Sequence, residues 1–179
     1  MKKIFALVLG AITAVLFVSC QDKKNTTPDS DSPVLKANYS LTLSVCDAAA
    51  DQQDVVKTVV NYKDNQGNPR TEEFLEYTEE MTLMSPINYS LPYKDTITIT
   101  QTLKEDVSLT KDQYDLGLDY SITVNSVDDN DGVFGTKTVE AKSVHYTVRK
   151  ENMALAFPKE ISFEISVDAK GSVAITTTN

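Results

Sequence analysis

The sequence predicts an all-β protein organised as an antiparallel β-sandwich, and three observations lead to this prediction. Apolar and polar residues alternate along most of the chain after position 37. Clusters of Asp, Asn and Gly separate the alternating runs, and segments with helical periodicity are short. Alternation with a period of two is typical of strands that bury one face and expose the other. We therefore expect about eight or nine strands in a single domain over residues 37–179, with a closed barrel as the alternative.

Four runs carry the clearest alternation and are expected to form core strands. Their apolar side chains fall on every second residue, and most of the positions between them are Ser or Thr. The enrichment in Thr, Val and Ile agrees with strand propensity. In the second run Gln101 is the one polar residue on the apolar face. The four runs are 39–45, 96–103, 120–124 and 161–167.

Three turn signals, each containing a Gly that can adopt positive φ, are expected to link neighbouring strands as hairpins. They cover residues 64–69, 128–132 and 168–171. In the strand that follows the second turn, the apolar residues change phase near Lys142 and Ser143. Because a shift of one residue moves side chains to the other face, we expect a β-bulge or a break there.

Helix is expected only in short pieces. Residues 47–54 contain three Ala and could form one or two turns. Residues 110–113 have the spacing of a capping box, and Gly117 could end the turn that they start. Neither segment is long enough to form a layer of its own, so the sandwich prediction stands.

The start of the chain predicts export. Lys2 and Lys3 precede an uncharged run, 4–18, and Cys20 follows it after a single Ser. A basic start, a short apolar stretch and a small residue before a cut are typical of an export signal. The Cys at the junction resembles the lipobox of bacterial lipoproteins, which implies cleavage before Cys20 and acyl chains such as palmitate on it. A transmembrane anchor is the alternative, but the uncharged positions, 4–21, number 18 and are at the short edge of the ~20 residues that a spanning helix needs.

Cleavage at this site defines a signal peptide, 1–19, and a lipidated tether, 20–36. The tether is polar and contains two Pro, so we expect it to be flexible. The Ser before the Cys and the Gln-Asp after it resemble lipoproteins of Bacteroidetes-type bacteria. This resemblance implies an outer-membrane protein held to the membrane through acyl chains. Whether the domain faces the cell surface or the periplasm is left open.

The segment from Leu109 to Val127 resembles the E–F corner and F strand of immunoglobulin-like and fibronectin type III domains. There a Tyr at the start of the strand folds its hydroxyl back to the backbone upstream, forming a tyrosine corner, and Tyr120 holds that position here. Asp115 and Gly117 echo the Asp-x-Gly that precedes the corner, with one extra residue before Tyr120. The resemblance implies an immunoglobulin-like β-sandwich, with a lipocalin-like barrel as the alternative.

The net charge and the cysteine content restrict what this protein can bind and how it can be cross-linked. The chain carries 26 acidic and 17 basic residues, a net charge of −9. Nucleic-acid binding needs clusters of Lys and Arg, so this class is excluded. If Cys20 is acylated, Cys46 has no partner for an intramolecular disulfide, and we expect it to be a small buried side chain.

The residues that carry chemistry form no recognisable constellation. Counted from Asp128 as a calcium loop, the Gly falls at the fifth position and Val139 at the twelfth, so the pattern fails and a solvated hairpin tip is expected. Neighbouring acidic residues on a strand point to opposite faces. Motifs of serine hydrolases and of phosphate-binding loops are absent from the sequence. We predict no catalytic residue, no cofactor and no metal, with a carboxylate-based hydrolase as the alternative.

Three tyrosines, Tyr77, Tyr89 and Tyr93, form a candidate recognition surface, since Tyr is favoured in interfaces. Half-buried strand positions are the alternative for these side chains. The sequence thus predicts an envelope-anchored binding or accessory module for a glycan, a peptide or a protein. The alternative is a structural subunit of a surface or pilus-like assembly, in which strands are donated between copies. The C-terminal hairpin, 161–177, discriminates between the two, because it would be unpaired or swapped in a donor.

Overall fold

Antiparallel strands make up most of the described chain, as the alternating pattern predicts. The structure is a computed structural model, and it describes residues 33–75, 80–85 and 87–178. The signal peptide, Cys20, most of the predicted tether and Tyr77 therefore lie outside the described residues. No helix within the described ranges is long and apolar enough to cross a bilayer.

The first of two large sheets is built around β1 and β8, which pair along their full length. β4 pairs with the other side of β1, and β9 pairs with the other side of β8. The short β5 also pairs with β1, near its start. The strands are β4 (Glu80–Met84), β1 (Lys36–Val45), β8 (Leu118–Val127), β9 (Val133–Ala141) and β5 (Tyr89–Ser90).

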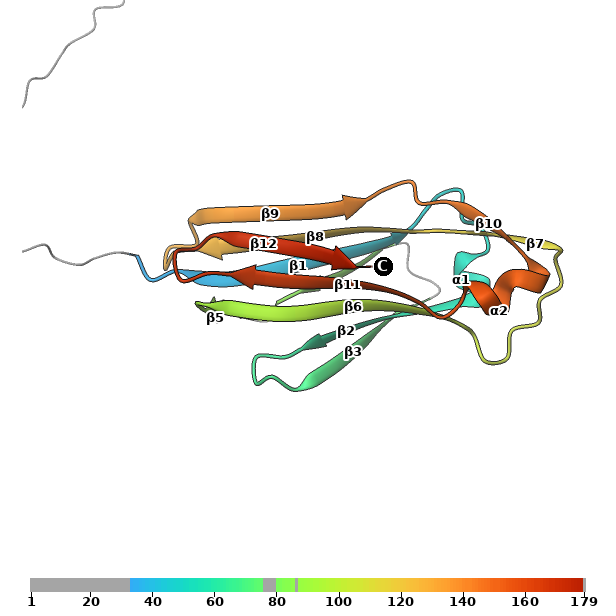
Figure 1. Cartoon of the computed structure of the whole chain (residues 1–179), viewed down its shortest axis with the longest axis horizontal. Helices are drawn as coiled ribbons and strands as arrows, with labels where there is room; N and C mark the ends of the chain where they lie inside the picture. The colour runs from blue at the N-terminus through green and yellow to red at the C-terminus, as the bar shows by residue number, and fades with distance from the viewer. Residues whose placement is uncertain (1–32, 76–79, 86, 179) are drawn as a thin grey trace, which may run out of the picture. The chain divides into compact units, whose positions relative to one another are not determined.

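The second large sheet has the order β12-β11-β6-β2-β3, and all of its strands are antiparallel to their neighbours. Its strands are β12 (Val173–Thr178), β11 (Lys159–Val167), β6 (Tyr93–Leu103), β2 (Val56–Lys63) and β3 (Pro69–Phe74). Figure 1 shows the strands of both sheets running roughly along one direction, from the end where β1 begins to the end that carries the helices.

The inner faces of the two sheets form one hydrophobic core. Leu41 and Ile122 come from the first sheet, Ile97 and Phe163 come from the second, and all four are fully buried. The ring of Tyr120 meets the ring of Phe163 edge to face across the core, with the centroids 5.2 Å apart. The chain is therefore an all-β sandwich, and its sheets do not close into the barrel considered as the alternative.

A smaller assembly, which we call the tip, extends the sandwich at one end. It consists of residues 46–55, 104–117 and 143–157. It holds α1 (Gln52–Val55), α2 (Met153–Ala156), the 3₁₀ turn η1 (Lys150–Asn152) and a two-stranded sheet of β7 (Gln113–Leu116) and β10 (Tyr146–Arg149). The tip has its own core, made by Val55, Tyr114, Leu116, Met153 and Phe157 together with Val56, the first residue of β2.

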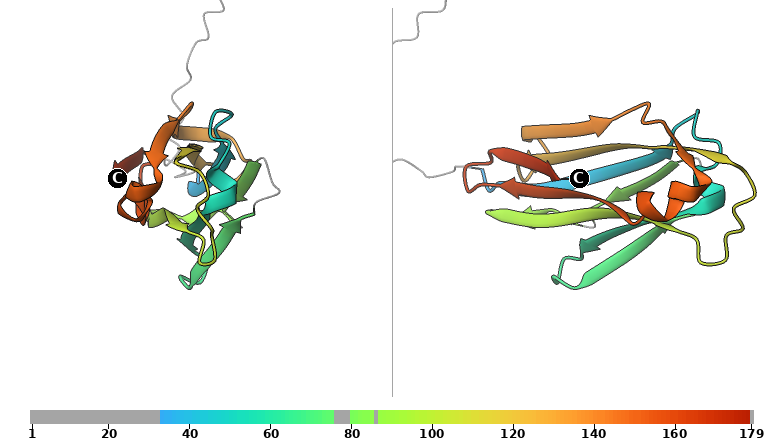
Figure 2. Two further views of the ribbon diagram at one scale, coloured as in Figure 1. Left: turned by 90° about the vertical axis from the view of Figure 1, so that its right-hand side faces the viewer. Right: turned by 45° about the vertical axis from the view of Figure 1, so that its right-hand side comes forward.

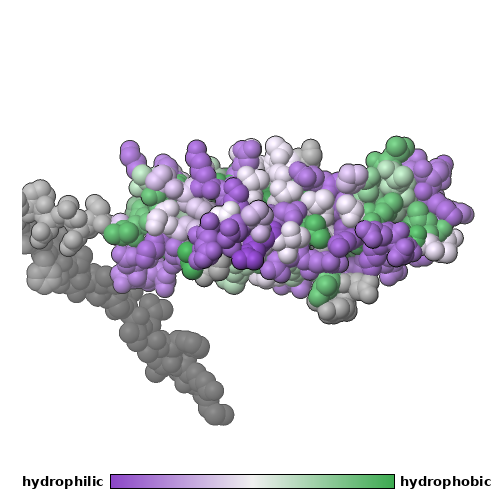
Figure 3. Space-filling view, turned by 90° about the horizontal axis from the view of Figure 1, so that it is seen from below, coloured by the Kyte–Doolittle hydropathy of each residue, from purple (hydrophilic) through white to green (hydrophobic). Residues whose placement is uncertain are grey.

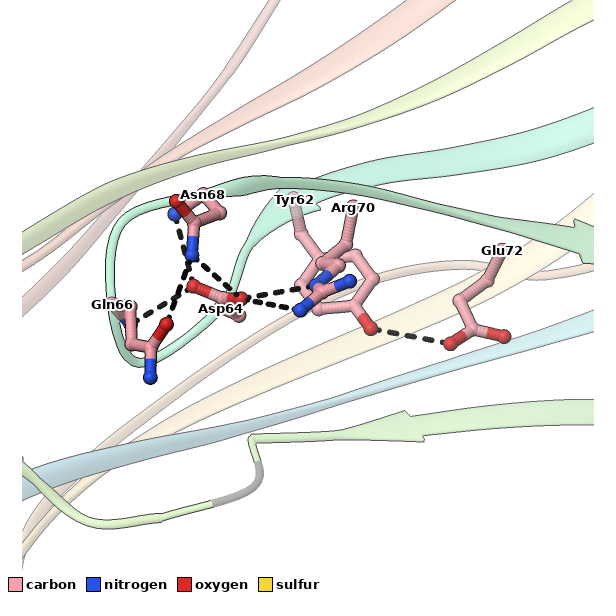
Figure 4. Close-up of polar contacts among 6 residues, drawn as sticks. All are labelled: Tyr62, Asp64, Gln66, Asn68, Arg70 and Glu72. Atoms are coloured by element: carbon pink, nitrogen blue, oxygen red, sulfur yellow. Dashed lines mark hydrogen bonds and ion pairs between the residues drawn. The ribbon is translucent and has the colours of Figure 1, made fainter.

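The three predicted hairpin turns adopt one shared geometry. Each begins with an Asp whose Oδ1 accepts hydrogen bonds from the backbone N–H groups two and four residues later, at 2.8–2.9 Å. The three residues are Asp64, Asp128 and Asp168. Figure 4 shows the first of these turns, where Asp64 also contacts the Arg70 side chain. The carboxylate thus accepts hydrogen bonds from backbone N–H groups that have no carbonyl acceptor within the tight turn.

The structure tests two local predictions. The predicted break near Lys142 is confirmed, because β9 ends at Ala141 and Ser143 adopts a positive φ of 55°. The helical turn expected at 110–113 is wrong. Gln113 instead begins β7, which pairs with β10. This pairing, together with the short strands at the sheet edges, gives twelve strands in the described ranges where eight or nine were expected.

Candidate functional site

The tip lies at the end of the described domain opposite the residues where that domain begins, as Figures 1 and 2 show. The domain begins at Pro33, and the ten residues of β1 lead from Lys36 to Val45, beside the tip. At about 3.3 Å per residue, β1 separates the two ends by about 30 Å. Binding residues are commonly carried by connections on a rigid scaffold. The tip is therefore the candidate functional site.

Asp51 holds two parts of the tip together. Its side chain is 6% exposed, forms an ion pair with Lys111, and accepts a 2.9 Å hydrogen bond from the backbone N–H of Asp115. Burial alone would raise the pKa of Asp51. The hydrogen bonds from Lys111 and from the Asp115 N–H outweigh it, so the pKa lies below its ordinary value of 3.8. The carboxylate thus fixes the connection after β6 against α1.

Gly117, between β7 and β8, allows the backbone of another tip segment to approach closely. A Cβ at this position would lie 1.8 Å from the carbonyl oxygen of Val144. The neighbouring residue Asp119 accepts hydrogen bonds from the N–H groups of Ser143 and Val144 at 3.0 and 2.9 Å. The side-chain oxygen of Gln52 accepts the N–H of Gly117 at 3.1 Å. These bonds position the segment that leads into β10.

A hollow of about 810 Å³ opens beside the tip, where β1 ends and where β4 and β8 begin. Its volume is within the ~300–1,000 Å³ range of ligand sites. Its lining includes the carboxylates of Asp47, Glu80 and Asp119 and the imidazole of His145. A partner that presents cationic or hydrogen-bond-donating groups suits a wall of this kind.

The hollow brings Cys46 and His145 into one lining, although they are far apart in the sequence. Cys46 is a free thiol and only 7% exposed, as expected from the sequence. The imidazole of His145 is directed to Asp115, with 3.4 Å between Nε2 and Oδ1. An activated thiol needs a base within hydrogen-bond reach. Within the described residues, the partner of His145 is a carboxylate and not the thiol.

The tip also presents an apolar side chain to solvent. Leu155 on α2 is 86% exposed, the largest value among the exposed large hydrophobic residues of the described chain. Met153, two residues earlier, is buried in the tip core and anchors the same helix. Figure 3 shows sizeable apolar surface at the right-hand end, where the tip lies, and a smaller apolar area at the opposite end. An apolar side chain held on an anchored helix is suited to insertion into a partner.

The predicted recognition tyrosines lie elsewhere and are used differently. Tyr89 stacks on Tyr93 with ring centroids 4.4 Å apart, and on its other side it stacks on the buried Tyr39 at 6.3 Å. The hydroxyls of Tyr39 and Tyr89 are buried, and burial raises the pKa of both groups. The rings thus extend the core, in agreement with the half-buried positions given as the alternative, and a role of Tyr89 and Tyr93 in recognition stays a prediction. Tyr77 lies outside the described residues.

The predicted tyrosine corner, Tyr120, lies near the start of β8, and its ring packs edge to face against Phe163 in the core. The hydroxyl contact that defines a tyrosine corner stays a prediction. Asp119, the preceding residue, accepts hydrogen bonds from the backbone N–H groups of Ser143 and Val144.

The described residues contain no group of three or more His, Cys, Asp or Glu side chains that could hold a metal ion. Comparison with protein-family models, with curated proteins and with solved structures finds nothing that matches this chain. Its function must therefore be inferred from its own residues.

Sequence reasoning missed most of the tip. Asp51, Lys111, Asp119 and Leu155 lie in segments without periodicity, where composition gives no signal for a binding surface. One signal was available at Gly117, a Gly placed directly before an alternating run. The sequence favours the end of a helical turn there, whereas the structure uses the missing side chain for the close approach of Val144.

Proposed function

We propose that this protein is an outer-membrane lipoprotein that acts as a binding or accessory module for a glycan, a peptide or a protein. Acyl chains on Cys20 hold it to the membrane, and residues 20–36 act as a flexible tether. The module acts by binding and not by catalysis.

The observation that carries the proposal is the pairing of the C-terminal hairpin. β11 lies between β12 and β6, and β12 pairs with β11 over six residues, from Val173 to Thr178. An assembly subunit that donates or receives strands needs an unpaired or exchanged strand. A hairpin that completes its own sheet therefore favours a binding module over the structural-subunit alternative.

We assign the binding surface of this module to the tip. The tether would join the domain near Lys36, and the tip lies at the opposite end of β1. The acidic hollow and Leu155 therefore lie at the end of the described domain that is away from its first residues. The tip is also held by many internal hydrogen bonds, so little ordering is required when a partner binds.

The anchor is tested by metabolic labelling. Cells that produce the full chain are grown with an alkynyl fatty acid, and the label on the protein is measured after coupling to a dye. We expect label on the wild type and none on Cys20→Ser. Label on Cys20→Ser, or retention of residues 1–19 in the mature wild type, contradicts the anchor.

The binding surface is tested by capture from native envelopes with the full lipidated chain. Leu155→Glu is compared with Met84→Glu, because Met84 is also highly exposed, at 68%, but lies on β4 away from α2. We expect the wild type and Met84→Glu to retain the same captured molecule and Leu155→Glu to lose it. Equal capture by the two variants would exclude the tip, and an exchanged dimer in solution would favour the structural subunit.

A further inference from the structure

A smaller cavity lies where the sandwich core meets the tip. It has a volume of about 260 Å³. The buried side chains of Gln101, Leu118 and Ile161 line it and are 2%, 3% and 6% exposed. The half-buried Tyr146 and Lys159 line it as well. Tyr120, Ala141 and Val144 complete the lining, so the cavity has a largely apolar wall that carries the Gln101 amide, the Lys159 ammonium and two tyrosine rings.

Gln101 carries the main argument. The sequence marks it as the one polar residue on the apolar face of its strand. The structure places it on the inner face of β6, and its amide nitrogen has no hydrogen-bond partner among the described residues. A buried donor without a partner costs about 1–3 kcal/mol. A side chain that carries such a cost and lines a cavity is a candidate ligand contact.

Lys159 supplies a positive charge beside the same cavity. It is the direct cross-strand partner of Gln101, so both side chains lie on the same face of the sheet. Its ammonium group lies 4.9 Å from the centroid of the Tyr146 ring. This cation–π contact holds the charge over an aromatic wall of the cavity.

From these contacts we propose that the cavity binds a short-chain monocarboxylate. The apolar chain would fill the space beside Leu118 and Ile161, and the carboxylate would accept hydrogen bonds from the Gln101 amide and the Lys159 ammonium. The cavity is slightly smaller than the ~300–1,000 Å³ of most ligand sites, which corresponds to a ligand of about six to ten non-hydrogen atoms. This inference does not depend on the proposed partner at the tip.

The competing occupant is water. A polar group in a cavity of this size can be satisfied by ordered water when two to four polar partners are available. Here the buried part of the lining offers the Gln101 amide among apolar side chains, and Lys159 already contacts an aromatic ring. The other polar side chains of the lining are the phenols of Tyr120 and Tyr146. An amphiphile uses both the apolar and the polar part of this lining, whereas water uses only the polar part.

The test is a titration of the full-length lipidated chain in detergent micelles, labelled with ¹⁵N at Gln. Hexanoate is the probe, hexylamine is the probe of opposite charge, and the Gln101 side-chain resonances are identified by their loss in Gln101→Leu. We expect a saturable shift of these resonances with hexanoate and none with hexylamine. Lys159→Gln should weaken hexanoate binding at least tenfold. Lys170→Gln is the matched control, because Lys170 is an exposed lysine in the β11–β12 turn, and it should bind as the wild type does.

Three results would overturn the inference. The first is no saturable shift at Gln101 with hexanoate, including the case in which this amide contacts only water. The second is equal binding of hexanoate and hexylamine. The third is equal affinity of Lys159→Gln and Lys170→Gln, which would remove the assigned carboxylate contact. Lys159 is at the edge of the core, so its variant tests the site even if Gln101→Leu does not fold.

Discussion

Gln101 and Lys159 stand directly opposite each other on β6 and β11, and both lie on the inner face of the second sheet. Two strand positions further along the sandwich, the corresponding inner-face pair is Ile99 with Ile161, which is apolar and buried. The polar pair therefore marks the place where the sandwich core ends and the tip begins. A sheet stabilised only by packing would continue the apolar pattern there.

Replacing this amide by a side chain of similar volume should stabilise the ligand-free protein. We expect Gln101→Leu to raise the free energy of unfolding by about 1 kcal/mol, because it removes a buried donor without a partner and adds apolar contact with Leu118 and Ile161. Urea unfolding of the full chain at neutral pH measures the difference. A loss of stability would show that the amide is satisfied in solution.

The close approach at Gly117 predicts a large steric effect. Gly117→Ala should cost more than about 3 kcal/mol, because the new Cβ meets the rigid backbone carbonyl of Val144. Gly67→Ala is the matched control. A Cβ there would have no heavy atom within 4 Å, but its φ is +81°, so only the left-handed backbone is penalised, by about 1 kcal/mol. Equal losses in urea unfolding would contradict the close approach.

Periodicity predicted the sandwich because side chains on its strands have only two environments, core and solvent. The runs at 39–45 and 161–167 belong to central strands, and their alternation follows from this arrangement. The hairpin turns were predicted for a local reason, since an Asp followed by a positive-φ residue satisfies its own backbone bonds. Both kinds of signal lie within a few consecutive residues.

The candidate site was not predictable in this way, because it depends on contacts between distant segments. Asp51 contacts Lys111, which lies 60 residues later, and Gly117 touches the backbone of Val144. The short β7 forms because β10 pairs with it, although its own residues favoured a helical turn. Residue type favours a surface role for Tyr89, with a half-buried strand position as the alternative, and the choice between them depends on Tyr39 on another strand, which stacks against Tyr89. Gln101 is different, because the sequence marks it as a polar residue on an apolar strand face and the structure buries it on that face.

The Asp51 carboxylate should contribute stability that depends on pH. Its folded pKa is lowered below 3.8, so its contribution is fully present above that value and is lost as pH falls through the folded pKa. Asp51→Asn should cost about 1–2 kcal/mol at pH 7, because the buried side chain loses its charge-assisted bonds to Lys111 and to the Asp115 N–H. The difference between wild type and variant in urea unfolding should stay constant down to about pH 5 and shrink below it. A difference that grows toward acid pH contradicts this assignment.

At Asp64, the effect of backbone N–H donors on the pKa of the carboxyl group can be distinguished from the effect of the neighbouring Arg70 charge. The pKa of Asp64 is lowered from 3.8 to about 2. The largest cause is the hydrogen bond from the N–H of Asn68; burial acts in the opposite direction, and the hydrogen bond from the N–H of Gln66 lowers the pKa further. Arg70 also lowers the pKa but is not the main cause. The carboxylate therefore stabilises the folded turn above pH 3.8, and this contribution is lost as pH falls toward 2.

The pKa of Asp64 can be measured by an NMR titration of its side-chain carboxyl carbon, with a midpoint of about 2 expected in the wild type. Arg70→Gln should raise this midpoint but leave it below 3.8, because the backbone donors remain in place at 2.9 Å. A return to 3.8 in Arg70→Gln would mean that the ion pair, and not the turn, holds the carboxylate. Such a result would also remove the reason for treating Asp128 and Asp168 as equivalents of Asp64, since the shared feature of the three turns is the pair of N–H groups.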